Sequence, residues 1–284
     1  ERTIMPQFRK AAVIGVGLIG GSLAAALKKK KLVRSVTGIS RRKSTVNTAL
    51  KKGLIDDAST SLAAVAGADL LVFAVPPGAV KALAAKAASL AGRNCLVIDV
   101  CSTKVEVSRI LSRYFPAYAG CHPLAGSEKK GPENADPGLF KGTLCVITGR
   151  GRSASTAAAL WRSIGSRVAY MSPSEHDKIL AYVSHLPHSV AFSLIDSVPE
   201  TFYRFSAGGL KDTTRIAASD SSLWADIIMS NRRNVARALG VFETKLKELR
   251  SAVSRGDASA LEKFLSRASS RRRMLEGACL SGSE

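Results

Sequence analysis

A glycine pattern near the start of the chain constrains the fold more than any other stretch. Gly15, Gly17 and Gly20 form G-x-G-x-x-G, which follows an apolar run at 11–16 and opens a segment with helical spacing at 18–31. In that context the first glycine allows a tight turn, the second lets a pyrophosphate approach the backbone, and the third lets helix and strand pack closely. The pattern predicts a dinucleotide-binding turn. The alternative is a glycine-rich turn that holds no ligand.

Apolar runs and helical segments alternate after this turn. Predicted strands at 35–40, 69–75 and 94–100 are separated by segments with helical spacing at 44–52 and 78–90. Near-continuous apolar strands that alternate with helices are typical of a parallel sheet covered on both faces. We therefore predict an α/β fold with a Rossmann-type doubly wound parallel sheet.

After the last predicted strand, at 167–171, the chain has helical spacing to its end. We expect helices over 174–199, 222–254 and 258–275, with a shorter helical piece after Phe205. The sequence therefore predicts two domains, a dinucleotide-binding domain at 1–171 and an all-helical substrate and dimerisation domain at 172–284.

The end of the second predicted strand indicates which cofactor binds. An acidic residue at this position would bind the ribose 2′-hydroxyl of NAD, but the chain has Ser40, Arg41 and Arg42 there. A guanidinium group suits a phosphate because its donors form a fork. We therefore expect NADP, with NAD as the less favoured cofactor. The alternative is that these are exposed turn residues in an NAD site.

Charge and composition exclude several classes of protein. The chain carries 42 Lys and Arg against 22 Asp and Glu, a net charge of +20. The basic residues are spread out and no aromatic stacking motif accompanies them, so we expect solvated surface and no nucleic-acid partner. No apolar run is long enough for a membrane span. Five scattered cysteines without C-x-x-C spacing suit a reducing compartment, the cytoplasm or, after removal of a transit peptide, the plastid stroma.

Two polar residues follow predicted strands, at the edge where such sheets bind ligands. Ser102 comes after one apolar run, and His122 ends a shorter one. An imidazole titrates near neutral pH and suits a general base. The alternatives are a helix cap for Ser102 and a structural role for His122. Thr103 and Glu106 fit a capping box, which would leave Ser102 to point at the cleft.

A metal site is not expected. His185 and His188 are three residues apart and one helical face would present both, but no third ligand has matching spacing.

Several motifs together resemble one family. They are the glycine turn, Asp99-x-x-Ser102-x-Lys104, His122-Pro-Leu-Ala-Gly-Ser-Glu128, Ser184-His-Leu-Pro-His188, and Lys211-Asp-Thr-Thr-Arg215-Ile-Ala with Trp224. In this order the chain resembles the prephenate/arogenate dehydrogenases of tyrosine biosynthesis, from about Arg9 to about Leu275. The last three motifs are far more specific than the glycine turn.

The resemblance implies oxidative decarboxylation of a small cyclohexadienyl acid. Ser40-Arg41-Arg42 resembles the NADP-using branch that prefers arogenate and forms tyrosine. The alternative is a prephenate dehydrogenase that forms 4-hydroxyphenylpyruvate with NAD or NADP. The resemblance also implies a homodimer, with the active site near the interface.

Residue roles follow from the matched motifs. His122 is expected to accept the substrate hydroxyl proton or polarise that group, and Ser102 to bond the same hydroxyl and orient His122. Arg215 is expected to hold a substrate carboxylate. Further residues are expected to line the substrate pocket, namely Ser127, His188 and Trp224, and the cofactor site, namely Leu18, Ile19, Val75 and Pro76. Taken alone, Arg215 also fits a surface ion pair, and Trp224 fits the core.

Two other functions remain open. One is a different dehydrogenase on the same fold, acting on a hydroxy acid or an imine, which would not explain His122 together with Arg215. The other is a dinucleotide-binding sensor, which needs no titrating base.

Overall fold

The computed structural model describes residues 7–125 and 129–280, with side chains as far as residue 276. The chain packs as two compact units that divide between Arg232 and Arg233. The predicted domain boundary after residue 171 follows the change from strands to helices, whereas the packing divides the chain later.

The first unit is built on one sheet, in which eight strands are described. Their order is β3-β2-β1-β4-β5-β6-β7-β8, and every neighbouring pair is parallel except β6 with β7. The strands are β1 (Phe8–Ile14), β2 (Val33–Ile39), β3 (Asp57–Ser59), β4 (Leu70–Phe73), β5 (Leu96–Asp99), β6 (Tyr118–Pro123), β7 (Leu144–Thr148) and β8 (Arg167–Tyr170). The predicted doubly wound sheet is confirmed. The short edge strand β3 and the reversal at β7 were not predicted.

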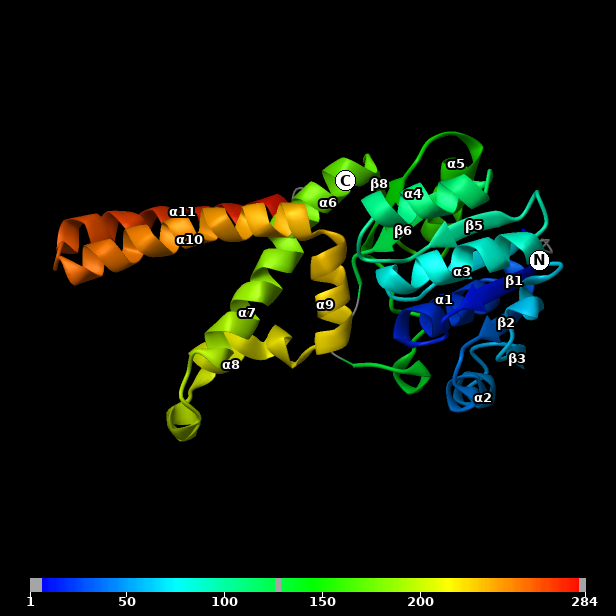
Figure 1. Ribbon diagram of the computed structural model, residues 1–284, viewed down its shortest axis with the longest axis horizontal. Helices are drawn as coiled ribbons and strands as arrows, with labels where there is room; N and C mark the ends of the chain where they lie inside the picture. The colour runs from blue at the N-terminus through cyan, green and yellow to red at the C-terminus, as the bar shows by residue number, and fades with distance from the viewer. Residues whose placement is uncertain (1–6, 126–128, 281–284) are drawn as a thin grey trace. The chain divides into compact units, whose positions relative to one another are not determined.

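Helices cover both faces of this sheet (Figure 1). One face packs against α1 (Leu18–Lys29), α2 (Lys43–Lys51) and α5 (Gly151–Ser163). The other packs against η1 (Leu62–Val65), α3 (Pro77–Leu90) and α4 (Val105–Tyr114). Because side chains alternate along a strand, β1 contributes to both cores, which explains why it is apolar from Ala11 to Ile14.

The helices that follow the sheet are shorter than predicted. They are α6 (Pro173–Leu180), the π turn η3 (Ala181–His185), α7 (Leu186–Asp196), η4 (Glu200–Phe205), α8 (Gly208–Thr214), η5 (Arg215–Ala218) and α9 (Ser221–Ser230). The π turn interrupts the helix predicted over 174–199. Pro187 explains the interruption, because its ring lacks an N–H and would clash with the carbonyl four residues earlier in a regular α-helix.

The long helix predicted over 222–254 breaks at Asn231, between α9 and α10 (Arg232–Ser254). The backbone of Asn231 leaves the helical region, and its side-chain amide donates to the carbonyl oxygen of Asp177 at 2.7 Å. A side chain that bonds a distant backbone group competes with the helix for its geometry.

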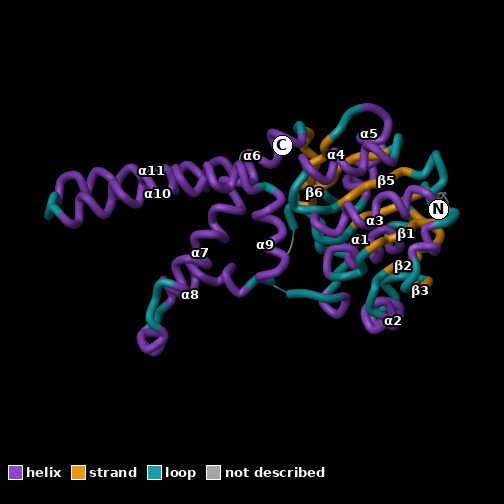
Figure 2. Tube along the Cα trace, viewed as in Figure 1, coloured by secondary structure: helices purple, strands orange, loops and turns teal. Residues whose placement is uncertain are grey.

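The second unit consists of most of α10 and of α11 (Ala258–Leu280), which form a helical hairpin (Figure 2). An ion pair between Arg267 and Glu248, 3.5 Å apart, joins the two helices. Several large apolar side chains of this unit are exposed: Val241, Leu246, Val253, Leu265, Met274 and Leu275. In the described part of the chain, no helix combines the length and apolar character that crossing a membrane requires.

Candidate active site

The turn between β1 and α1 is closely packed except at its middle glycine. Gly15 has a φ of 97°, and a side chain there would collide with the carbonyl oxygen of Ala74. A side chain on Gly20 would collide with the carbonyl oxygen of Gly15, so packing requires both glycines. A Cβ on Gly17, by contrast, meets nothing within 4 Å. This open side, at the N-terminus of α1, suits an approaching pyrophosphate.

A cavity of about 530 Å³ opens beside this turn. Its lining joins five residues expected at the cofactor site with four others: Gly15, Gly17, Ser40, Arg41 and Arg42, with Val16, Thr45, Gly131 and Pro132. The side chains of Arg41 and Arg42 are exposed, and the first turn of α2 holds no acidic residue. Cations at a helix start suit a phosphate group, so these residues fit the 2′-phosphate of a dinucleotide.

Besides Gly20, four residues expected at the cofactor do not line this cavity. Leu18 and Ile19 are half-buried in the first turn of α1, and Val75 and Pro76 follow β4. The Cγ1 atom of Val75 lies 3.0 Å from the position that a Cβ on Gly15 would take, so Val75 borders the turn. Contact of these four residues with a cofactor stays a prediction.

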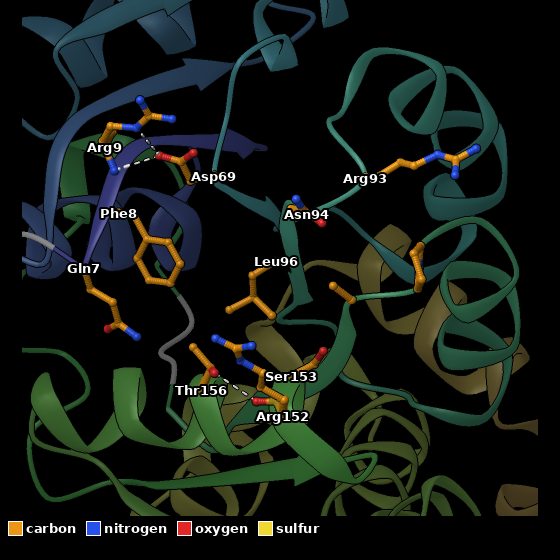
Figure 3. Close-up of a pocket in the computed structure, with 12 residues that line it drawn as sticks. Gln7, Phe8, Arg9, Asp69, Arg93, Asn94, Leu96, Arg152, Ser153 and Thr156 are labelled. Carbon is orange, nitrogen blue, oxygen red and sulfur yellow. Dashed lines mark hydrogen bonds and ion pairs between the residues drawn. The ribbon is translucent and has the colours of Figure 1, made fainter.

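A larger cavity, of about 1060 Å³, lies at the opposite edge of the sheet. It opens near the amino ends of β1 and β5 and the start of α5, and Arg9, Asp69 and Arg152 contribute to its lining (Figure 3). Asp69 accepts a hydrogen bond there from the backbone N–H of Arg9 at 2.8 Å. None of the residues expected to bind or react lines this cavity, because those residues follow the carboxyl ends of the strands or lie on later helices.

His122, on β6, is hydrogen-bonded to a second histidine. The Nδ1 atom of His122 lies 2.8 Å from Nε2 of His176 on α6. His176 is fully buried, and its Nδ1 atom lies 2.8 Å from Oδ1 of Asp177. Burial lowers the pKa of His122 well below its usual value, and His176 and Lys104 lower it further. At neutral pH, His122 is therefore an uncharged imidazole, the form that accepts a proton.

Asp177 caps α4 from a different part of the chain. Its Oδ1 atom accepts the N–H of Lys104 at 2.7 Å, and its Oδ2 atom accepts the N–H of Val105 at 2.9 Å. The predicted capping box of Thr103 and Glu106 is therefore wrong, since Lys104 is the N-cap residue and the Thr103 hydroxyl bonds to α9 instead. A carboxylate from α6 satisfies these backbone N–H groups, so the helix start needs no local side-chain cap.

A buried ion pair adjoins this group. Lys104 and Asp99 are both fully buried and are paired with each other. Asp99 also accepts the Cys101 N–H at 2.9 Å and the Tyr118 hydroxyl at 2.6 Å. Burial by itself would lower the pKa of Lys104, but the attraction of Asp99 outweighs it and raises that pKa, so the ammonium stays charged. This fixed positive charge disfavours protonation of His122.

The π turn, α7 and α9 bring a second set of side chains together. His188 stacks on Trp224 with ring centroids 3.5 Å apart and 19° between the planes. His185 meets the same indole edge-on, with centroids 6.1 Å apart. The Nδ1 atom of His188 lies 3.0 Å from the carbonyl oxygen of Ser184, which orients the ring. Burial lowers the pKa of His188, and the nearby charge of Arg215 lowers it further.

All four histidines of the chain are connected in this region. His122 and His176 share a hydrogen bond. The side-chain amide of Asn231 donates to the carbonyl oxygen of Asp177 and lies 3.2 Å from Nδ1 of His185. His185 and His188 both contact the Trp224 ring. Because Arg215 in turn influences His188, the sheet edge and the later helices contribute to one cluster of polar side chains. The imidazole of His122 and the guanidinium of Arg215, which the sequence predicts to act on one substrate, thus both belong to the first unit.

Two predicted site residues are placed less completely. Ser102 lies half-buried in the loop between β5 and α4. The hydrogen bond that orients the His122 ring joins it to His176, and the orienting role of Ser102 stays a prediction. Ser127 lies outside the described residues.

Sequence reasoning missed His176 and Asp177 as members of the site. Their only local signal was a His-Asp pair next to a helix start, which is also typical of ordinary surface helices. Among the described residues, no group of three or more His, Cys, Asp or Glu is arranged to hold a metal ion. His185 and His188 are arranged about the Trp224 ring instead.

Comparison with known families gives matches along most of the chain. A family model described as the nucleotide-binding domain of prephenate dehydrogenase matches residues 23–170. A second, described as the dimerization domain of prephenate dehydrogenase, matches residues 172–267.

Individual proteins are similar over nearly the same length. A cyclohexadienyl dehydrogenase from Zymomonas mobilis is 34% identical over 271 residues, which cover 90% of this chain and 92% of the relative. The solved structure of prephenate dehydrogenase from Aquifex aeolicus, in complex with hydroxyphenyl propionate and NAD+, is 31% identical with a TM-score of 0.86, covering 94% and 98% of the two chains. Synechocystis arogenate dehydrogenase shares the fold at 24% identity, with a TM-score of 0.78 over 94% and 99% of the chains.

Proposed function

The chain belongs to the prephenate dehydrogenase family, and from that premise we propose that it converts arogenate to tyrosine with NADP. The family makes it an oxidoreductase of aromatic amino acid biosynthesis that uses a nicotinamide cofactor. The choice of NADP and arogenate is the finer part of the proposal. The observation that carries the reaction is the hydrogen bond between His176 and His122, an uncharged imidazole at neutral pH, together with the His188–Trp224 stack on the helices that also supply Arg215.

The reaction needs a base for the substrate hydroxyl. A bound nicotinamide cofactor supplies the acceptor for the hydride that leaves the hydroxyl-bearing ring carbon. His122 takes the hydroxyl proton as that hydride departs. It returns a proton to the same oxygen once CO₂ has left the opposite ring carbon and the electron pair of the broken carbon–carbon bond has made the ring aromatic. An uncharged imidazole at neutral pH suits the first of these transfers.

Residues of α7, η5 and α9 are proposed to bind the substrate acid. Arg215 presents a guanidinium that suits a carboxylate, and the stacked pair of His188 and Trp224 provides a flat wall for a six-membered ring. Ser102 and Ser127 are proposed to contact the substrate through their hydroxyls, as the family motifs imply.

The preference for NADP rests on the cavity beside the glycine turn. Ser40, Arg41, Arg42 and Thr45 line it together, and they provide two hydroxyls and two guanidinium groups. Such donors favour a 2′-phosphate over a bare 2′-hydroxyl, which an acidic side chain would bind.

Prephenate is the second candidate substrate. The relatives from Bacillus subtilis and Aquifex aeolicus are named prephenate dehydrogenases, whereas arogenate is favoured here by the Ser40-Arg41-Arg42 pattern alone. The two substrates differ only in a keto or an amino group on the side chain.

A steady-state assay with each substrate and each cofactor tests both choices. The proposal expects the highest kcat/KM for arogenate with NADP. Faster turnover of prephenate than of arogenate would make prephenate the substrate. Equal kcat/KM with NAD and NADP would contradict the role proposed for Arg41 and Arg42. No turnover of either substrate, in a protein that still binds the cofactor, would contradict the reaction itself.

We also propose a homodimer in the cytoplasm. The match to a dimerization domain and the exposed apolar side chains of α10 and α11 support self-association. Four described cysteines are free and buried, which suits a reducing compartment. Light scattering of the purified chain tests the dimer, and a monomer at micromolar concentration would contradict it.

A further inference from the structure

His122, His176 and Asp177 form a chain of hydrogen bonds whose direction can be worked out atom by atom. Asp177 accepts two backbone N–H groups, from Lys104 at 2.7 Å and from Val105 at 2.9 Å. A carboxylate has only acceptor sites to offer, and a backbone N–H only donates. The third partner of this carboxylate, Nδ1 of His176 at 2.8 Å, must therefore carry a hydrogen.

The state of His176 fixes the state of the next ring. A neutral imidazole carries one N–H, so with Nδ1 protonated the Nε2 atom of His176 has an unshared electron pair. That pair lies 2.8 Å from Nδ1 of His122, which must then be the donor. His122 is left with its own unshared pair on Nε2.

The surroundings of His176 favour its neutral form. Its side chain is fully buried on α6, and burial lowers its pKa below the usual value. Asp177 opposes this shift, as does Asp99 from β5, while the Lys104 ammonium lowers the pKa further. Around His122, the Lys104 ammonium disfavours a second proton, and a proton on His176 or His185 would disfavour it as well.

We propose that His176 and Asp177 are positioning residues that hold His122 in the Nδ1–H tautomer, so that its Nε2 atom is the proton acceptor. The inference rests on the proposed function of His122 as the base. In the proton transfer, the substrate O–H bond breaks and an Nε2–H bond forms on His122. The imidazolium that results keeps its Nδ1–H bond to His176, whose other nitrogen faces the Asp177 carboxylate. The carboxylate of Asp177, which caps α4, therefore also fixes the tautomer of the base.

Nitrogen NMR tests the tautomers directly. The full chain contains only four histidines, so long-range proton–nitrogen spectra of the labelled protein at pH 7.5, with and without NADP, can be assigned by replacing each in turn. We expect the Nδ1–H pattern for both His122 and His176, whereas free histidine favours Nε2–H. An Nε2–H pattern, or a mixture, at His122 would overturn the inference whatever the activity.

Kinetics of two variants test the positioning role. His176→Gln places a carbonyl oxygen near the lost Nε2 atom and keeps an acceptor for His122, whereas His176→Phe removes the acceptor. We expect His176→Phe to lower kcat roughly 10- to 1000-fold, at most as much as removal of the base, because the tautomer is no longer held. His176→Gln should recover most of this loss, and KM should change less than twofold in both because His176 is buried away from substrate. Equal kcat in both variants, whether high or low, would overturn the role.

Asp69→Asn is the matched control. Asp69 also accepts two backbone N–H groups, from Arg9 at 2.8 Å and Lys10 at 3.3 Å, but it lies at the opposite edge of the sheet. The Asp69→Asn substitution should leave kcat and the His122 tautomer unchanged.

Two further results separate this inference from the proposed function. If His176→Phe does not fold, the His122 tautomer in His176→Gln decides, with Nδ1–H expected and Nε2–H overturning the inference. If the tautomers are as inferred but His122→Asn turns over normally, the proposed function fails and the acceptor role fails with it.

Discussion

The cofactor turn and the histidine cluster lie in the same compact unit but are built in different ways. The turn draws on Gly15, Gly17 and Gly20, and its cavity adds the short stretch at 40–45. The cluster draws on β6, α6 and the π turn, and its decisive hydrogen bonds join Asp177 to residues more than 70 positions away. The first region depends on the shape of the backbone. The second depends on a series of hydrogen bonds between segments that are distant in the sequence.

The largest effect should come from the cluster. His122→Asn removes the proton acceptor while the glycine turn stays intact, so turnover should fall roughly 10²- to 10⁴-fold with cofactor binding unchanged. Steady-state rates and a cofactor titration measure the two quantities separately. Normal turnover would show that the two regions do not cooperate in a reaction.

A pH series should separate the regions, because every histidine lies in the cluster. Burial lowers the pKa of His185 to about 4, with Asp177 opposing and His176 adding to the shift. As the pH falls below 6.5, the unfolded chain takes up a proton that the folded chain takes up only near pH 4. The free energy of unfolding should therefore be highest above pH 6.5 and fall by about 3 kcal/mol between pH 6.5 and 4 for this residue.

Urea unfolding at several pH values measures this slope. The carboxylate with a lowered pKa at the other edge, Asp69, acts mainly below its ordinary value near 4, outside the window. In His185→Gln the free energy of unfolding should depend less steeply on pH between 6.5 and 4, by the contribution of at most one bound proton. An unchanged slope would mean that burial of His185 does not control its protonation.

Two glycine variants sharpen the account of the turn. Gly20→Ala forces a methyl group against the Gly15 carbonyl and should cost about 1–3 kcal/mol of folding free energy. Gly17→Ala faces open space and should leave stability within about 0.5 kcal/mol while weakening cofactor binding. Thermal melts and a cofactor titration distinguish them. Equal destabilisation by both would contradict the division between packing and ligand space.

The smallest predicted effect concerns cofactor choice. Arg41→Asp places a carboxylate where a 2′-phosphate is proposed to bind, and it should weaken NADP roughly tenfold while sparing NAD. The guanidinium is exposed and solvent screens it, which keeps the effect modest. Dissociation constants for both cofactors measure it, with Lys43→Ala as a control from the same exposed stretch. Equal weakening of NADP and NAD would contradict the phosphate role.

The features that could be predicted from the sequence follow the same division. Apolar runs and glycines act within a few residues, so the sheet, its helices and the dinucleotide turn could be predicted. The edge strand β3 is only three residues long and carries no apolar run. The cap on α4 could not be predicted, because Thr103 and Glu106 satisfy the local rule while Asp177 supplies the actual acceptor. His176 stayed hidden for the same reason, since its partners come from other elements.

The π turn has a consequence for how insertions and deletions would act on this chain. It holds one residue more than a regular α-helical turn, and Val183 within it is exposed. Deleting Val183 would remove that extra residue and bring the Pro187 ring against the carbonyl four residues before it, at a cost of about 3 kcal/mol. The direction of α7 would change little, because a π turn takes up one added residue without turning the helix that follows it. The length of this turn is therefore matched to the proline after it, and a deletion here should lower stability more than it displaces His188 from Trp224.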